Sequence, residues 1–318
     1  MASNYWDSTQ AKHFTYTKSS LHQTRSHLLA SNPALVIKHP LPFDSRHLSI
    51  FLQQNLNKLA RRLNLRQQAS ATAQIYLKRF YLCVEIRRTN PYLLMATALY
   101  LACKMEESPQ HIRLVLGEAA RLWPDLCANE VGKIGEAEFG LISTLGSRLI
   151  LHHPYRSLGE LGQVLGLSAE EAVLAGSVVN DCLVTDLPLL YAPHVLAVAA
   201  IFLAVVLRPA GQPAGLQAHS NAGSSASSAP ASSPAAGAGP AFGGGVAQSA
   251  LASFAGLKQA GPKMGRMVDW LAESRVSVEQ VVDAVQELCS LYECWEGYQE
   301  RGVREAVGRL AREVGAGK

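Results

Sequence analysis

The sequence lacks the short motifs that carry enzyme chemistry. It contains no GxSxG elbow, no P-loop, no HExxH pair and no catalytic-loop motif of a kinase. Its six cysteines form no CxxC pair and no zinc-like spacing with histidine, so the sequence predicts neither a metal site nor a cofactor. We therefore expect a protein without catalytic residues of its own.

Charge and targeting signals are also sparse. Charged residues make up 17% of the chain, below the usual quarter, and the net charge is only +4. This mild excess of positive charge does not suggest direct binding to nucleic acid, which usually needs a strongly basic domain.

The start MASNYWDSTQAKHF lacks the apolar run of a secretory signal, and the cysteines lie mostly in apolar stretches. Both observations favour a reducing compartment, the cytosol or the nucleus.

One uncharged stretch, Leu187 to Leu207, raises the question of a membrane span. Pro188 and Pro193 interrupt it. A helix from Pro193 to Leu207 rises only about 22 Å, which is short of a hydrocarbon core of about 30 Å. We predict a buried central helix and no membrane contact.

Helical periodicity dominates the chain, and period-two strand patterns do not recur. The first half predicts five helices: one behind an Asp44 N-cap, then segments near 66–82, 91–107, 112–122 and 129–145. The second half predicts a helix near 155–165 and a second helix that begins at a Ser168–Glu171 capping box. Further helices are expected from Pro193, over 263–272, from Ser277 and over 298–314. Residues 209–261 are almost entirely Ala, Gly, Ser and Pro, and we expect a disordered loop there.

The chain resembles itself at an offset of 102 residues. Pro91 falls on Pro193, and the two apolar helices that follow coincide. Lys104, near the end of the first apolar helix, falls on Val206 of the second. Two copies of a five-helix unit predict an all-α fold of tandem bundles, in which only the first copy has a polar helix end.

Lys104 admits two interpretations. A lysine at the end of an apolar helix either extends to water or meets a partner that accepts its protons. Glu106 and Glu107 follow at once, and such a pair usually forms a solvated helix exit.

The residues resemble a known family. RQQASATAQIYLKRFY followed by NPYLLMATALYLACKMEE, within two five-helix repeats, resembles the tandem cyclin box. The start NYW, the joint HHPYR and the run VVNDCLVTDLPLLYAP are similar to C-type cyclins, the cyclin subunits of the Mediator kinase module. The resemblance divides the chain into an N-terminal helix and extension (1–42, irregular over Ser31–Pro42), a first cyclin box (43–152), a second box interrupted by the insertion (153–298) and a C-terminal segment (299–318).

The resemblance implies a nuclear regulatory subunit. It would bind and activate a cyclin-dependent serine/threonine kinase of the Mediator complex and so regulate, as activator or repressor, transcription by RNA polymerase II. Its partners would be the kinase catalytic subunit and other kinase-module subunits. The family pattern places the kinase contacts at Lys104, Glu138, Glu107 and Tyr100.

Two further sets of residues follow from the resemblance. Trp6, Asn180 and Asp181 are expected to form a groove for another Mediator subunit, although Asn180 and Asp181 also fit a cap or bridge inside the second repeat. The joint between the repeats comprises His153, Pro154, Tyr155 and Arg156, of which Tyr155 and Arg156 are expected to pack between the repeats. His152 and His153 are neighbours whose side chains point apart on an extended joint, which argues against a shared metal ion.

Two alternatives remain at this point. One is a cyclin of another transcriptional branch. The other is a DNA-binding general factor of the TFIIB type, which shares the fold and binds DNA with steep salt dependence, although residues 1–42 contain no cysteine for its zinc ribbon. The basic side chains of the first repeat indicate a solvated face or a face for phosphate or an acidic partner: Lys58, Arg61, Arg62, Arg66, Lys78, Arg79, Arg87 and Arg88.

The insertion yields a prediction from sequence alone. Deleting residues 212–258 should leave the melting temperature nearly unchanged, because loop closure depends only weakly on length and the segment has no core to lose. Thermal unfolding of the full and shortened chains tests this, and a large drop would mean that the segment folds back onto the helices.

Overall fold

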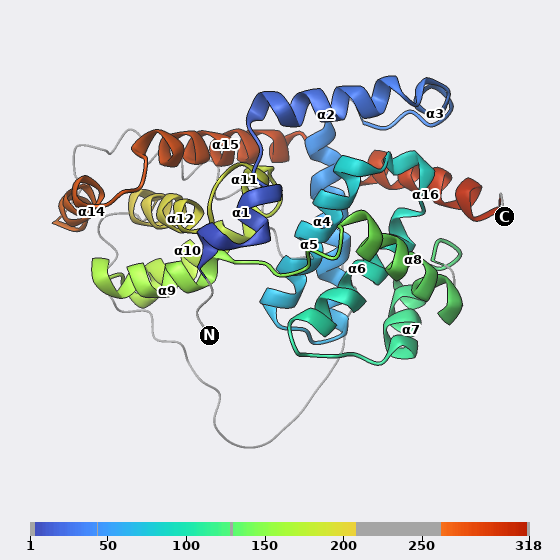
Figure 1. The fold of residues 1–318 in the computed structure, drawn as a ribbon, viewed down its shortest axis with the longest axis horizontal. Helices are drawn as coiled ribbons and strands as arrows, with labels where there is room; N and C mark the ends of the chain where they lie inside the picture. The colour runs from blue at the N-terminus through green and yellow to red at the C-terminus, as the bar shows by residue number, and fades with distance from the viewer. Residues whose placement is uncertain (1–3, 43, 128–129, 208–261, 317–318) are drawn as a thin grey trace, which may run out of the picture.

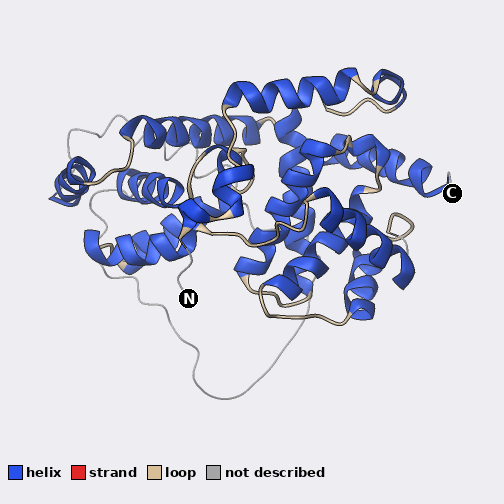
Figure 2. Cartoon of the chain, in the orientation of Figure 1, coloured by secondary structure: helices blue, strands red, loops and turns tan. Residues whose placement is uncertain are grey.

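The computed structural model describes residues 4–42, 44–127, 130–207 and 262–316. Within these ranges the chain consists of helices and loops without a strand, which confirms the all-α prediction (Figure 2). The insertion predicted at 209–261 lies outside the described residues.

The first bundle contains the five helices expected from the sequence. They are α4 (Ser45–Arg62), α5 (Gln67–Cys83), α6 (Pro91–Met105), α7 (Ile112–Leu122) and α8 (Val131–Thr144). Asp44 caps α4 as predicted, because its carboxylate accepts a hydrogen bond of 2.8 Å from the backbone N–H of Arg46. The central helix α6 has Met95, Ala96 and Leu99 fully buried.

The second bundle repeats this arrangement. Its five helices are α9 (Pro154–Leu165), α10 (Ala169–Cys182), α12 (Pro193–Leu207), α14 (Pro262–Glu273) and α15 (Val278–Glu296). A four-residue helix, α11 (Leu187–Leu190), lies in the connection between α10 and α12. Ser168 and Glu171 form the predicted capping box at α10. The central helix α12 is buried along its length, and its many alanines let α10 and α15 pack closely against it. The offset of 102 residues therefore joins the first residues of two equivalent helices, Pro91 and Pro193.

The N-terminal region contains more structure than the sequence indicated. It forms the 3₁₀ turn η1 (Tyr5–Asp7), α1 (Thr9–His13), α2 (Lys18–Ala30) and α3 (Pro33–Lys38). Helix α3 lies in the stretch expected to be irregular; six residues are too few to show a helical period, although Pro33 occupies the favoured first position. Helix α2 runs across the top of the molecule in Figure 1, where Arg25 donates two hydrogen bonds, of 2.6 and 2.7 Å, to Asp186 of the second repeat.

Residues 5–16, here called the N-terminal strap, cross the joint between the bundles. The Gln10 side chain donates to the backbone carbonyl of His152 and accepts from its N–H, at 3.4 and 2.7 Å. The ring of Phe14 lies 3.8 Å from Cζ of Arg79, a buried guanidinium without a hydrogen-bond partner among the described residues. Burial lowers the pKa of Arg79 to about 10. The strap thus holds both repeats and covers a buried cation.

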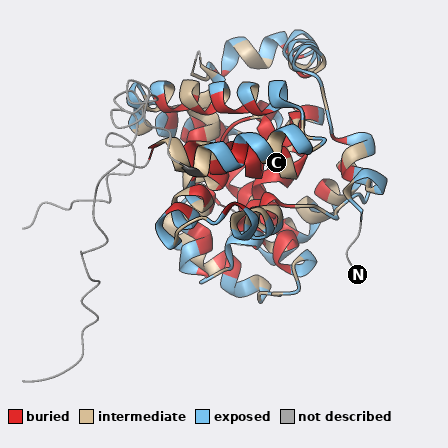
Figure 3. Cartoon of the chain, turned by 90° about the vertical axis from the view of Figure 1, so that its left-hand side faces the viewer, coloured by how far each residue is buried: buried red, intermediate tan, exposed pale blue. Residues whose placement is uncertain are grey.

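The last helix, α16 (Glu300–Ala316), returns to the first bundle (Figure 1). Its apolar face places Val303, Val307 and Ala311 in the core built around α6. Buried residues therefore fill the centre of the molecule, while the outer faces of the helices stay exposed (Figure 3).

Candidate partner-binding site

Lys104 and Glu138 come together at the edge of the first bundle. Helix α6 is buried up to Cys103, and Lys104 is the first residue of its last turn to face solvent. Its ammonium lies 2.5 Å from Oε1 of Glu138 on α8 and 4.4 Å from the centroid of the Tyr100 ring. The Lys104 side chain is 41% exposed and that of Glu138 15%. Three predicted kinase contacts therefore form one cluster whose lysine remains accessible to a partner.

The electrostatics keep this lysine charged. Partial burial opposes the charge, but the hydrogen bond and the charge of Glu138 outweigh it, so the pKa of Lys104 is raised. A positive and a negative group side by side can bind a carbonyl oxygen and an amide N–H, the two groups that a peptide backbone offers at a helix end.

The backbone turns sharply just beyond Lys104. The N–H of Ser108 donates to the carbonyl of Cys103 at 2.9 Å, and Glu107 adopts a left-handed conformation with φ 51°. This conformation costs a non-glycine residue roughly 1 kcal/mol. The Glu107 side chain is exposed and forms no hydrogen bond or ion pair with the described residues, so this predicted contact stands apart from the cluster.

Exposed apolar side chains lie next to the ion pair in the chain, and the sequence analysis missed them. Phe139 follows Glu138 directly and is 76% exposed, and Met105, which follows Lys104, is exposed as well. Phe139 lies off the apolar stripe of α8, and an aromatic residue on the polar face of an amphipathic helix was the available signal. Exposed aromatic residues next to a charged pair are typical of protein interfaces.

Glu106 does not form a solvated helix exit, so that expectation is wrong for this residue. Its carboxylate accepts hydrogen bonds of 2.6 Å from both Gln68 and Thr72, one turn apart on α5. His153 of the joint lies 2.7 Å from the Thr72 hydroxyl and 3.8 Å from Glu106. Burial would raise the pKa of Glu106, but hydrogen bonds from His153, Thr72 and Gln68 lower it overall. The end of α6 is therefore attached to the joint.

The other joint residues differ in position. Pro154 is the first residue of α9, and the Tyr155 hydroxyl donates to Asn180 at 2.8 Å while its ring packs against Ile75 and Leu183. Tyr155 thus lies between the repeats as expected. Arg156 does not: its side chain is 69% exposed and pairs with Glu160 one turn along α9. A side chain one position after Tyr155 points to another side of the helix, away from the first bundle.

The three residues predicted to share a groove each have different partners in the structure. Asn180 accepts a hydrogen bond from Gln67 of the first repeat, and Asp181 accepts one from Tyr292 on α15. These bonds fit the bridging interpretation of the pair. Trp6 lies on the strap, 64% exposed, with its ring centroid 5.7 Å from that of His194. Among the described residues, no hydrogen bond or ring contact joins Trp6 to Asn180 or Asp181.

One cluster of metal-ligating side chains was not expected from the sequence. The ligand atoms of Asp44, His47 and Cys294 lie within 4.8 Å of one another, between the start of α4 and the end of α15. Arg46 holds the same Asp44 carboxylate and lowers its pKa to about 2. The positive guanidinium competes with a cation for this carboxylate.

No described helix has the combination of length and apolar composition that a membrane span requires, and α12 is enclosed by its own bundle.

Two linked five-helix repeats with a lysine–glutamate pair on the first define a tandem cyclin fold. A model of the cyclin N-terminal domain matches residues 17–150. The chain is 48% identical to the RNA polymerase II holoenzyme cyclin-like subunit of Aspergillus fumigatus, over 98% of both chains. It is 46% identical to the protein of the same name from Neurospora crassa, over the full length of both. The chain belongs to the cyclin family.

Solved structures show the same fold. A chain of the CAK complex from Chaetomium thermophilum has a TM-score of 0.61 at 17% identity, covering 98% of this chain and 87% of that one. A chain of the yeast TFIIK complex has a TM-score of 0.57 at 16% identity, covering 91% and 100%.

Asp181 provides a test of the bridging interpretation. Burial raises its pKa to about 6 from 3.8, against the hydrogen bond from Tyr292. The folded state therefore binds this proton more tightly than the unfolded chain, and the resulting stability is lost as the pH rises from 3.8 through 6. Replacing Asp181 by Asn should raise the free energy of unfolding at pH 7.5 by about 2–3 kcal/mol and change it little near pH 4.

Asp186 is the matched control. Burial opposes its charge, but Arg25 and Lys78 lower its pKa overall. The stability that it contributes is present above its unfolded pKa and is lost as the pH falls, so Asp186→Asn should destabilise the protein at pH 7.5. Urea unfolding at both pH values measures the two effects, and equal effects of the two substitutions would contradict the assignment.

Proposed function

We propose that this cyclin binds a cyclin-dependent serine/threonine kinase through the face that carries Lys104 and Glu138, and that it activates the kinase. The observation that carries the proposal is the ion pair between Lys104, whose side chain is 41% exposed, and the mostly buried Glu138, next to the exposed Phe139 on α8. Lys104 offers protons to backbone carbonyls and Glu138 accepts from backbone N–H groups. The pair therefore recognises the backbone of the kinase segment, while Phe139 supplies apolar contact.

Activation follows from holding one conformation. A kinase needs an ion pair between a lysine and a glutamate, and the glutamate lies on a mobile helix of the small lobe. A subunit that contacts this helix only in its inward position shifts the population toward the active state. The chain supplies binding free energy and no catalytic group.

We assign the kinase to the Mediator complex and the site of action to the nucleus. The name of the relatives, cyclin-like subunits of the RNA polymerase II holoenzyme, supports a role at this polymerase. The residues NYW, HHPYR and VVNDCLVTDLPLLYAP support the C type over another transcriptional cyclin. Exposed Trp6 is the candidate contact for a second subunit of the kinase module.

Many basic side chains of the first repeat are paired with other groups of the protein, which disfavours direct binding to DNA. Several side chains that were candidates for a phosphate-binding face have partners inside the molecule: Lys58 with Glu300, Arg62 with Glu118, Lys78 with the Val184 carbonyl, Arg87 with Glu85, and Arg79 beneath Phe14. Few of these cations remain for phosphate groups.

Replacing Lys104 by Ala tests the kinase site. We expect kinase binding to weaken by about 2–5 kcal/mol, because Glu138 loses its partner and the kinase carbonyls lose their donor. Affinity for the co-purified kinase and its activation toward a peptide substrate are the measurements.

Lys58→Ala is the control for this experiment. Lys58 also pairs with a glutamate, Glu300, at 3.0 Å, and its side chain is 44% exposed, but it lies on α4 against α16. We expect near-normal binding from Lys58→Ala. Undiminished activation by Lys104→Ala, or an equal loss from both variants, would refute the assigned site.

Replacing Trp6 by Ala tests the second contact. The side chain is mostly exposed, so the substitution should leave thermal stability nearly unchanged, and it should keep kinase activation intact. We expect loss of the larger kinase-module subunits from material purified with a tagged chain from native extract. Retention of those subunits by Trp6→Ala would remove Trp6 from that interface.

A further inference from the structure

A cavity of about 480 Å³ lies between the first bundle and the last turn of α16. Helix α8, the start of α6 and the segment 125–127 complete its walls. Three cations from separate segments line it: Arg88 of the 3₁₀ turn η2 (Ile86–Arg88), Lys133 of α8 and Arg312 of α16. Asp125 is the one acidic side chain among the lining residues, so the cavity carries an excess of positive charge.

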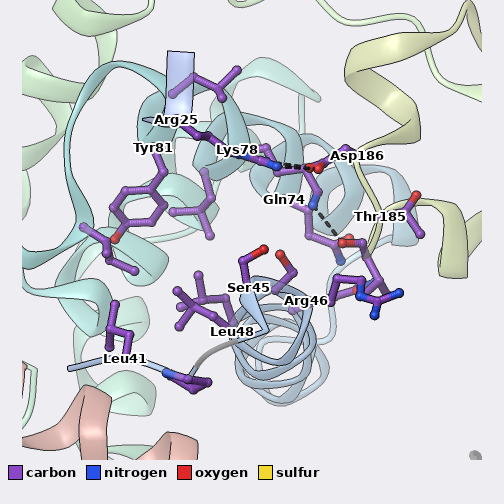
Figure 4. Close-up of a pocket in the computed structure, with 18 of the residues that line it drawn as sticks. Arg25, Leu41, Ser45, Arg46, Leu48, Gln74, Lys78, Tyr81, Thr185 and Asp186 are labelled. Carbon is purple, nitrogen blue, oxygen red and sulfur yellow. Dashed lines mark hydrogen bonds and ion pairs between the residues drawn. The ribbon is translucent and has the colours of Figure 1, made fainter. Parts of the chain in front are cut away.

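The cations of this cavity have no acidic partner within the protein. None of the three forms an ion pair with a described residue, and neither does Asp125. In the cavity between α2 and the two repeats, by contrast, Arg25 binds Asp186 (Figure 4), and Arg87 binds Glu85. Unpaired cations that line a cavity can form charge-assisted hydrogen bonds with an anion. The cavity at α16 is therefore the one suited to a negatively charged ligand.

Asn32 fixes the direction of the Arg88 side chain. The Asn32 amide nitrogen donates to the Leu28 carbonyl at 2.7 Å, so the amide oxygen accepts from Nε of Arg88, at 2.8 Å. Asn32 is only 8% exposed, which keeps this arrangement in place. The two terminal nitrogens of the guanidinium form no hydrogen bond with a described residue. An arginine held in this way can bind two oxygens of one phosphate group.

The most buried side chains of the lining are apolar. Phe80 and Leu94 are 7% and 4% exposed, and Leu93 and Leu126 are partly buried. A free inorganic anion gains nothing from such a surface, because only apolar groups are stabilised by leaving water. A ligand that joins a negative charge to an apolar group uses both parts of the cavity.

We propose that this cavity binds a phosphorylated serine or threonine of a partner protein, together with the apolar side chain of a neighbouring residue. The phosphate carries nearly two negative charges at neutral pH and three acceptor oxygens, which suits cations from three segments. The apolar side chain packs against Leu93 and Leu126. Nucleic acid fits less well, because its backbone needs a row of cations along several phosphates.

The cavity adjoins the face proposed for the kinase. Lys133, Ala137 and Gly140 line it from one side of α8, at the spacing of neighbours on a helix. Glu138 follows Ala137 directly and points to another side of the helix, where it pairs with Lys104. A phosphorylated segment in the cavity thus lies beside that face. Its binding to the full chain does not rest on the kinase assignment.

Matched peptides test the phosphate. A short fluorescent peptide that contains phosphoserine followed by leucine is titrated with the full-length protein, and fluorescence polarisation gives Kd. We expect the same peptide with unmodified serine to bind about tenfold more weakly or worse.

Arg312→Gln tests the role of the cavity cations, and we expect it to weaken phosphopeptide binding about tenfold. Arg309→Gln is the matched control. Arg309 lies one turn away on α16, is exposed and forms no ion pair with a described residue, but it does not line the cavity. Both substitutions remove the same charge, so an effect of overall charge alone would be equal in the two variants.

A filling variant tests the location. A side chain placed on Gly140 meets no other atom within 4 Å, so Gly140→Leu should extend into the cavity and abolish phosphopeptide binding. The melting temperature should stay the same or rise, because leucine favours a helix more than glycine does. Gly135→Leu, on the same helix with equally open space but outside the cavity, should bind normally.

Three results would overturn the proposal: equal affinity for the two peptides, equal losses from Arg312→Gln and Arg309→Gln, or binding that survives Gly140→Leu. Inorganic phosphate that binds as tightly as the phosphopeptide would also refute it and leave a simple anion site. A single-stranded oligonucleotide that displaces the peptide at equal concentration would assign the cavity to nucleic acid instead.

Discussion

The fold depends on enclosing one apolar helix in each repeat. Helices α6 and α12 have few polar side chains, so neighbouring helices must cover them on all sides. This requirement produces the bundle around each and explains why charge emerges only where α6 leaves its core, at Lys104. The second repeat has Val206 at the corresponding position, and its central helix offers no such charge. The asymmetry between two equivalent helices thus places on the first repeat the lysine–glutamate pair that we propose binds the kinase backbone.

The joint between the repeats is connected to that charged helix end. Glu106, two residues after Lys104, is held by Thr72 and lies near His153 of the joint. Tyr155 and the N-terminal strap add further bonds across the same region. A shift of one repeat against the other would therefore move the last turn of α6. The position of the partner-binding face depends on contacts that lie outside the first repeat.

Much of this architecture was predictable from the sequence. The ten repeat helices, the caps at Asp44 and Ser168 and the equivalence of Pro91 and Pro193 follow from local spacing, which reports which face of a helix is buried. The proximity of Lys104 and Glu138 came from the family pattern. Features that depend on distant segments were not predictable: the strap, the return of α16 and the hydrogen bonds to Glu106 all join residues whose pairing leaves no periodic signal. Arg156 was placed wrongly because its direction depends on the exact phase of α9.

The return of α16 has a consequence for how the protein is made. Val303, Val307 and Ala311 complete a core whose other helices end at Thr144. Synthesis proceeds from the N-terminus, so the first repeat emerges from the ribosome long before these side chains exist. Its apolar face therefore stays exposed to solvent while the whole second repeat is synthesised. Contacts between residues so far apart in the sequence also slow folding. Until α16 has been made, the first repeat therefore exposes the apolar surface that Val303, Val307 and Ala311 cover in the folded protein.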